Sequence, residues 1–259
     1  MLNQVAKRSA KAVALAGGIR AGRRPGDVVI LLYHRLGADT RSEIELDGRT
    51  FARHLERIVA KDTPRSLEDA ISGGEGVVVT FDDGTRDFYE SALPLLVSHR
   101  VPALLYLATG GVATNGNASP DALTWKQLEE ATATGLVTIG SHTHSHADLA
   151  AATEREADEE MRRSKELIED RLGVSCRHFA YPWGLASPDA ERVARRLFAT
   201  AALDGWRVNR RAAIDPYRLA RIPVLRSDGQ FFFRAKLRGR LNGEAMLYRV
   251  AHRGPWRPR

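Results

Sequence analysis

The sequence has little cysteine and no long apolar run, and each absence excludes a class of protein. Cys176 is the only cysteine in 259 residues, so neither an intrachain disulfide nor a zinc site built from thiolates can form. We expect Cys176 to fill a small apolar space at the start of a strand. No stretch of eighteen apolar residues occurs, so the sequence predicts no membrane-spanning helix.

The sequence also lacks the usual signatures of nucleic-acid recognition, although the chain is basic, with a net charge of +7 and a pI of about 9.8. It contains no zinc-finger pattern, no basic region followed by heptads and no aromatic RNA-binding motif. We therefore predict no nucleic-acid partner. The positive charge is concentrated in two terminal segments, 1–26 and 229–259, and this placement favours attraction to an anionic surface.

The two terminal segments carry separate predictions. The apolar stretch 12–16 is too short for a cleaved signal peptide and is followed by arginines, so we expect a cytoplasmic protein. From 234 to 259, Glu244 is the only acidic residue, and a basic segment gains about 1 kcal/mol per charge beside anionic lipid. We expect a peripheral contact with the inner membrane face, near a lipid-linked sugar. A pair of solvated basic helices is the alternative, and the oligomeric state stays open.

Apolar runs and helical patterns alternate along the chain. Continuous apolar runs suit strands that are buried on both faces of a parallel sheet, and their alternation with helices implies crossover connections. An incomplete barrel is favoured over an open sheet. Capping residues begin helices at Thr50, Thr124, Thr153 and Ser187, and a further helix from Thr85 contains Pro94. The five clear runs are 28–34, 76–81, 103–109, 136–141 and 177–181, and weaker runs are 199–204 and 219–225.

Two adjacent carboxylates follow one predicted strand, in the segment Thr80–Gly84 (TFDDG). Neighbouring side chains of a strand point to opposite sides, but the turn that Gly84 permits can bring both carboxylates to one site. One then binds a cation while the other stays free as a base. Taken alone, the pattern fits equally well an acidic turn that caps the next helix.

Three histidines, His142, His144 and His146, follow the predicted strand 136–141. Imidazole suits zinc and similar metals. His142 and His146, four positions apart, can converge on one ion from a tight turn, whereas His144 points elsewhere and supports its neighbours. A polar surface loop is the alternative.

A third motif, Arg177–Gly184 (RHFAYPWG), reads as a strand that runs into an aromatic turn. All three motifs lie at the carboxyl ends of predicted strands. In parallel α/β architectures, active sites form at this edge of the sheet. Two histidines and one aspartate leave coordination positions open to water, as catalytic metals require. We expect a divalent cation, Zn²⁺ first, with Co²⁺, Ni²⁺ or Fe²⁺ as alternatives.

The order Thr-Phe-Asp-Asp-Gly, His-Thr-x-x-His and Phe-Ala-Tyr-Pro-x-Gly resembles that of the polysaccharide deacetylases with the NodB-like domain, carbohydrate esterase family 4. The resemblance spans about 28–224. It implies a distorted (β/α) barrel of about seven parallel strands, with 27–228 as the catalytic domain between a basic N-terminal segment, 1–26, and a basic helical C-terminal tail, 229–259.

The resemblance also implies residue roles and a reaction. The reaction is the hydrolysis of N-acetyl groups on amino sugars of a polysaccharide or glycolipid, with release of acetate. Asp82 is the general base, and the backbone N–H of Trp183 helps to bind the oxyanion. The implied metal ligands are Asp83, His142 and His146, and the implied substrate contacts are Tyr181 and Pro182.

Two departures from the family pattern concern the acid and the base. Many members have an arginine that orients the base at the position where this sequence has Ala180. Many also have a late histidine that acts as the general acid, but this sequence has no histidine between His178 and His252. His34, at the end of the first predicted strand, is our substitute for the acid, and Asp82 acting in both roles is the alternative.

An O-acetyl esterase of the xylan type and a non-catalytic glycan-binding module are the alternative functions.

Overall fold

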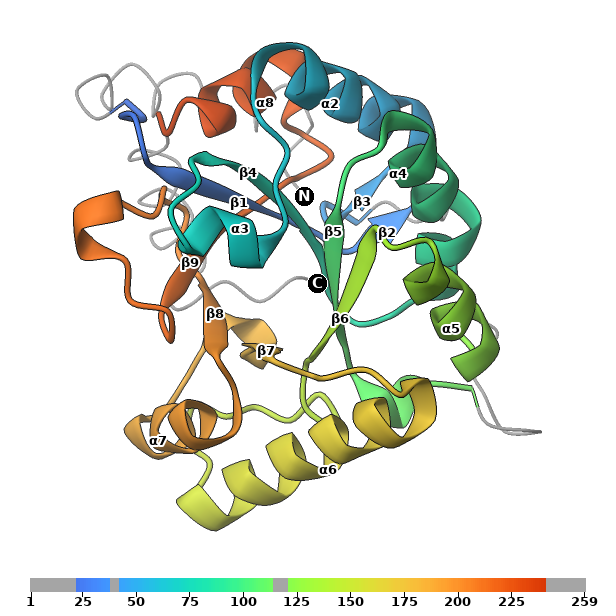
Figure 1. The fold of residues 1–259 in the computed structure, drawn as a ribbon, viewed down its shortest axis with the longest axis vertical. Helices are drawn as coiled ribbons and strands as arrows, with labels where there is room; N and C mark the ends of the chain where they lie inside the picture. Colours follow the sequence, from blue (N-terminus) through green and yellow to red (C-terminus); the bar gives the residue numbers. More distant parts are fainter. Residues whose placement is uncertain (1–21, 38–41, 114–120, 241–259) are drawn as a thin grey trace.

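The computed structural model describes residues 22–37, 42–113 and 121–240. Within these ranges, seven parallel strands close into one barrel, and neighbours in the chain are neighbours in the barrel (Figure 1). Strand β1 pairs with both β4 and β9, which closes the ring. All seven predicted strands are confirmed, and so is the barrel. They are β1 (Val28–Tyr33), β4 (Gly76–Phe81), β5 (Ala103–Leu107), β6 (Val137–Ser141), β7 (His178–Ala180), β8 (Thr200–Asp204) and β9 (Leu219–Pro223).

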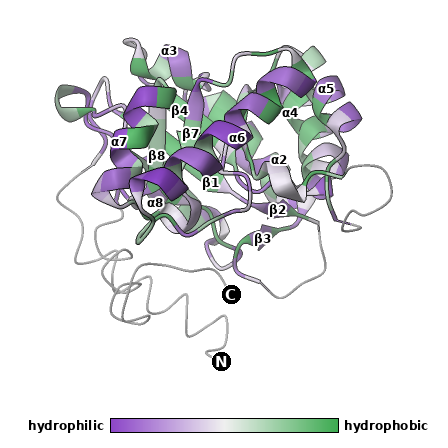
Figure 2. Cartoon of the chain, turned by 90° about the horizontal axis from the view of Figure 1, so that it is seen from below, coloured by the Kyte–Doolittle hydropathy of each residue, from purple (hydrophilic) through white to green (hydrophobic). Residues whose placement is uncertain are grey.

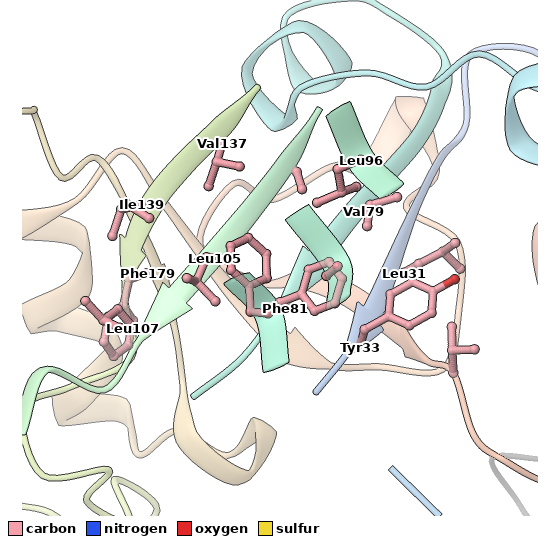
Figure 3. Packing of buried hydrophobic residues seen from close by; sticks show 14 of the residues in the cluster. Leu31, Tyr33, Val79, Phe81, Leu96, Leu105, Leu107, Val137, Ile139 and Phe179 are labelled. Carbon is pink, nitrogen blue, oxygen red and sulfur yellow. The ribbon is translucent and has the colours of Figure 1, made fainter. Parts of the chain in front are cut away.

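The strands are apolar on both faces because each face has its own core. One set of side chains, including Ile30, Val78 and Leu104, fills the barrel interior. The alternate residues point to the surrounding helices, as Figure 3 shows for Leu31 and Leu105. This alternation decides which residue after each strand points into the barrel. A two-stranded sheet of β2 (Arg35–Leu36) and β3 (Glu45–Leu46) lies outside the ring.

Helices surround the barrel, and most begin where the sequence predicts. Thr124 and Thr153 form capping boxes, and Ser187 caps α7 with a proline in its first turn. Helix α2 is capped by Asp47 rather than Thr50, because the Asp47 carboxylate accepts the Thr50 backbone N–H. The helices are α2 (Gly48–Lys61), α3 (Leu67–Ile71), α4 (Leu93–His99), α5 (Trp125–Ala133), α6 (Glu154–Leu172), α7 (Pro188–Leu197) and α8 (Gly229–Leu237).

The predicted helix from Thr85 is interrupted in the structure. A π-helical turn, Phe88–Ala92, precedes α4, and Pro94 lies in the first turn of α4. Proline has no N–H to donate, and the π-helical turn, in which the Leu93 N–H bonds the Phe88 carbonyl, directly precedes it.

Helix α8 packs on the domain rather than extending from it. Phe233 is buried and stacks on His54 of α2, with 3.6 Å between ring centroids. Lys236 is also buried and is paired with Asp228 at 2.6 Å. By contrast, α6 and α7 have largely hydrophilic outer surfaces (Figure 2). Residues 1–21 and 241–259, which hold most of the predicted basic segments, lie outside the described residues.

The described part of the chain contains no helix that is both long and apolar enough to span a bilayer.

The core around β5 gives a direct test of the packing. Leu105 is fully buried between the barrel and the helices, whereas Val97 on α4 is 43% exposed. We expect Leu105→Ala to lower the free energy of unfolding by about 2–5 kcal/mol, because a buried cavity replaces the side chain. Val97→Ala should change it by under about 1 kcal/mol. Urea unfolding of both variants measures the difference, and equal losses would contradict this packing.

Candidate active site at the carboxyl ends of the strands

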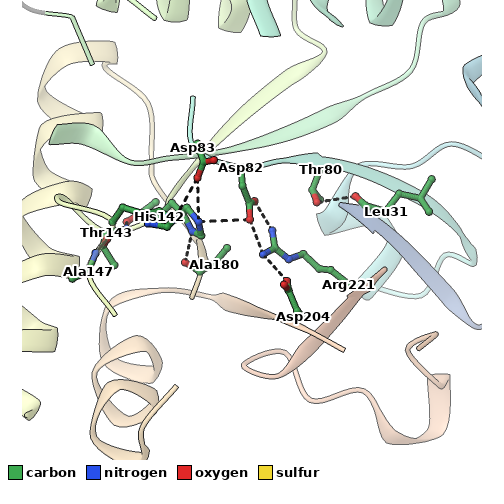
Figure 4. A network of polar contacts seen from close by, with 12 residues as sticks. Leu31, Thr80, Asp82, Asp83, His142, Thr143, Ala147, Ala180, Asp204 and Arg221 are labelled. Atoms are coloured by element: carbon green, nitrogen blue, oxygen red, sulfur yellow. Dashed lines mark hydrogen bonds and ion pairs between the residues drawn. The ribbon is translucent and has the colours of Figure 1, made fainter. Parts of the chain in front are cut away.

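The predicted site residues gather at one end of the barrel. Asp82 and Asp83 follow β4, and His142 follows β6 (Figure 4). His146 lies in the loop after His142, and Trp183 lies in the turn after β7. All of these positions are at the carboxyl ends of strands, where parallel α/β barrels build their active sites.

Asp82 and Asp83 diverge at a strained turn. Asp82 continues the inward side of β4 and is 3% exposed. Asp83 has a φ of 72°, which is rare for a residue with a Cβ, and it is followed by Gly84 with a φ of 88°. A Cβ on Gly84 would lie 2.3 Å from the Leu107 side chain. The backbone therefore turns at Asp83, and the two carboxylates point to different places.

Asp83, His142 and His146 form a group that fits a metal ion. Each offers one ligand atom, and these atoms lie within 4.8 Å of one another. The Asp83 Oδ1 atom lies 3.8 Å from His142 Nε2 and 3.4 Å from His146 Nε2. Ligands at about 2.1 Å from a tetrahedral ion lie about 3.4 Å apart. The spacing of the three side chains therefore suits Zn²⁺ or a similar cation.

The tautomer of His142 is also the one that a metal ligand needs. Its Nδ1–H donates to the Ala180 carbonyl at 2.8 Å, which leaves Nε2 unprotonated and directed toward Asp83. Burial lowers the pKa of His142, and this outweighs the charges of Asp82 and Asp83, which raise it. His142 is therefore neutral at physiological pH, as metal coordination requires.

The loop that carries His146 is anchored by Glu160 of α6. The Glu160 carboxylate accepts the backbone N–H groups of His144 and Ser145 at 3.0 and 2.8 Å, and the Ser145 hydroxyl at 2.9 Å. Thr143 and His146 have φ angles of 66° and 58°. These left-handed residues cost free energy and persist only where the surroundings hold them. His144 does not face the metal group, since its Nδ1 bonds Thr109 Oγ1 at 3.0 Å.

Arg221 is the main site residue that the sequence interpretation missed. Its guanidinium donates to both oxygens of Asp82, at 2.5 and 2.8 Å, from β9, which is separated from β4 only by β1. Both side chains are buried. The alternation of side chains along β9 could have predicted this. Leu219 points into the barrel, so Arg221, two residues later, points to the same side. Arg221 thus supplies the cation that the sequence lacks at Ala180.

Asp204 completes this buried network. It accepts from Arg221 at 3.3 Å, and burial raises its pKa. Burial also raises the pKa of Asp82, but the charge of Arg221 and its hydrogen bonds outweigh this, so the net shift is downward. Gly184, with a φ of 65°, lies so close to Asp204 that a Cβ would be 2.4 Å from its side chain. Asp204 is therefore part of the site.

The other predicted residues are placed as follows. His34 is 8% exposed at the end of β1, at the same edge of the barrel as Asp82 and Asp204. The Trp183 ring lies 4.9 Å from that of His146, centroid to centroid. Tyr181 is fully buried and packs edge-on against Phe179, and Pro182 is also buried. The Tyr181 ring belongs to the core, so a substrate contact of Tyr181 would involve its backbone, and the predicted contacts of Tyr181 and Pro182 stay predictions.

Comparison with known families gives an independent result. A family model described as polysaccharide deacetylase matches residues 71–202, about half of the chain. The chain belongs to the polysaccharide deacetylase family. The matched region contains all three predicted metal ligands and Asp82, but it ends before Arg221.

Individual deacetylase relatives agree with this result. A putative polysaccharide deacetylase of Bacillus subtilis, YxkH, is 24% identical over 182 residues, which are 67% of this chain and 62% of the relative. A poly-beta-1,6-N-acetyl-D-glucosamine N-deacetylase of Staphylococcus aureus is 28% identical over 128 residues, 46% of this chain and 44% of the relative. The chain thus spans less than two thirds of the length of these curated relatives.

Solved structures of other proteins share the fold. The Streptococcus pyogenes deacetylase PplD, solved in complex with acetate, matches with a TM-score of 0.74 and 23% identity, over 82% of this chain and 99% of that one. IcaB from Ammonifex degensii matches with a TM-score of 0.70 and 27% identity, over 78% and 93%.

The anchoring of the loop by Glu160 predicts an effect on metal affinity. We expect Glu160→Ala to raise the Kd for Zn²⁺ by about 10- to 100-fold, as losses of such supporting contacts typically do. Zinc titration against a competing chelator measures it. Glu159→Ala is the matched control, since this exposed neighbour lacks contacts with the loop. An unchanged Kd in Glu160→Ala, or equal changes in both variants, would contradict the anchoring role.

Proposed function

We propose that this chain is a metal-dependent N-deacetylase that removes acetyl groups from amino sugars of a polysaccharide or glycolipid. One observation carries the proposal: three metal-type ligands lie together, while a second carboxylate, Asp82, is held beside them by Arg221. The distance of 3.6 Å from Asp82 Oδ2 to His142 Nε2 supports a role for Asp82 as a base beside the metal group. A binding module has no need to hold such a base.

The residues divide the reaction between them. A cation held by Asp83, His142 and His146 would polarise the acetyl carbonyl and make a water molecule more acidic. Asp82 accepts the proton of the water that attacks the carbonyl carbon. The backbone N–H of Trp183 donates to the oxyanion. The bond from carbon to nitrogen then breaks, and His34 donates a proton to the leaving amine, so that acetate and a free amino sugar result.

The nitrogen substrate is preferred over an oxygen ester for two reasons. The Staphylococcus aureus relatives are named N-deacetylases of an N-acetyl-D-glucosamine polymer, and the base, metal group and His34 supply what amide hydrolysis requires. An O-acetyl esterase of the xylan type is the second candidate.

Acetate release from acetylated glycans tests the proposal. We expect release from N-acetylated glycans and glycolipids, its loss on chelation, and its return with Zn²⁺, Co²⁺, Ni²⁺ or Fe²⁺. Asp82→Asn should lose about 100- to 10,000-fold in turnover while keeping bound metal, because an amide cannot accept the proton. Asp83→Asn should instead lose metal. Release from O-acetylated xylan alone would favour the esterase, and no release from any glycan would favour a binding module.

Arg221 should control the acid limb of the pH profile. The Asp82 base must be ionised, and its lowered pKa keeps it ionised below the usual range, so kcat/KM should fall only as pH drops through that low value. Removal of the guanidinium charge in Arg221→Gln raises the pKa of Asp82, which moves the acid limb to higher pH.

Arg221→Lys is the matched comparison because it retains the charge but cannot bond both oxygens. We expect it to lower kcat with a smaller displacement of the acid limb. An acid limb that stays fixed in Arg221→Gln would show that this pair does not set the protonation of the base. Circular dichroism confirms that both variants are folded.

His34 should be needed for protonation of the amine. We expect His34→Ala to lose about 100- to 10,000-fold in turnover with metal retained. His99→Ala, on the outer helix α4, should keep full activity. If His34→Ala loses less than tenfold and its high-pH limb is unmoved, the acid is Asp82 in its protonated form or solvent.

A further inference from the structure

A polar cavity of about 480 Å³ lies at the end of the barrel opposite the candidate active site. It is formed where the chain enters β1, where α2 ends, where β4 begins and where α8 ends. These four segments are distant in sequence and meet only in the fold. The residues that line it are Gly22, Arg23, Arg24, Pro25, Lys61, Asp62, Thr63, Glu75, Leu237, Arg238 and Arg240.

The cavity has an excess of positive charge. Its two acidic residues already have partners, since Asp62 pairs with Arg23 at 3.0 Å and Glu75 accepts the Gly26 backbone N–H. The ends of α2 and α8 contribute about half a negative charge each. The lining has five positively charged side chains. After the two acidic side chains and the two half charges of the helix ends are subtracted, a net charge of about +2 remains. Four exposed cations lack a carboxylate partner among the described residues: Arg24, Lys61, Arg238 and Arg240.

Both ends of the described chain reach this cavity. Gly22 and Arg240 line it, and the Arg23 backbone N–H donates to the Arg238 carbonyl at 2.8 Å. The sequence beyond them adds more positive charge, because 1–21 contains no acidic residue and 241–259 contains only Glu244. The flanking sequence therefore adds more cations than carboxylates next to the cavity, and an external anion would balance them.

We propose that this end of the barrel docks on an anionic phospholipid membrane, with the cavity receiving a headgroup phosphate. Arginine forks bind phosphate oxygens in pairs, and lysine adds a point charge. The cations come from separate segments around one hollow, and the basic flanking sequences start at its rim. A planar anionic surface contacts all of them together, which a single free anion cannot do.

Docking through this end fixes the orientation of the enzyme. Glu75 and Asp82 are seven residues apart along β4, so the cavity and the catalytic edge are separated by about 23 Å along the strand. The catalytic edge then faces away from the bilayer. This consequence rests on the proposed function, and it favours a glycan that extends into solution over a sugar at the lipid surface.

Vesicle co-sedimentation of the full chain tests the docking. We expect salt-sensitive binding to vesicles that contain phosphatidylglycerol and none to phosphatidylcholine alone. Lys61→Gln/Arg240→Gln should weaken binding about 25-fold, which is about fivefold per charge. Arg53→Gln/Arg155→Gln removes the same charge from exposed residues elsewhere and should weaken it much less.

Three results would overturn the docking. One is no binding to the anionic vesicles at low salt. Another is equal weakening in the two double variants, which would assign the attraction to net charge alone. The third is tight binding of inorganic phosphate without vesicle binding, which would make the cavity a site for a free anion. Acetate release from a soluble N-acetylated oligosaccharide should be unchanged in Lys61→Gln/Arg240→Gln, so a failure of the proposed function is recognised separately.

Discussion

The ion pair of Asp82 with Arg221 is the interaction on which the candidate site depends. It joins β4 to β9 across the barrel mouth with two hydrogen bonds, and both side chains are almost fully buried. Removal of one partner from such a pair leaves an uncompensated buried charge, which is strongly destabilising. The pair therefore fixes the position of the carboxylate, and it keeps Asp82 ionised, since the pKa of Asp82 is lowered despite its burial.

This pair also explains how two adjacent aspartates take different roles. Asp82 follows the inward alternation of β4 and meets Arg221, whereas the left-handed backbone at Asp83 directs the second carboxylate to His142 and His146. Five of the six non-glycine residues with positive φ lie at this edge of the described structure, and Arg100 is the exception. Strain of this kind is concentrated where a site must be held in one geometry.

Much of the architecture follows from local patterns in the sequence. All seven strands are predictable because a barrel strand must be apolar on both faces, and the ligand group is predictable because Asp83 and His142 directly follow such strands. The partner of Asp82 was not predicted, because the last strand, β9, comes near β4 only when the barrel closes through β1. The cavity near Lys61 depends in the same way on segments that meet only after folding. The compartment and the membrane contact stay predictions.

The central claim is that Asp83, His142 and His146 hold a metal while Asp82 remains outside its coordination. Anomalous scattering from crystals grown with Zn²⁺ tests this most directly. The account predicts a single peak at about 2.0–2.2 Å from Asp83 Oδ1 and the Nε2 atoms of both histidines, with Asp82 still bonded to Arg221. A peak that is coordinated by Asp82, or a peak away from these three residues, would contradict it.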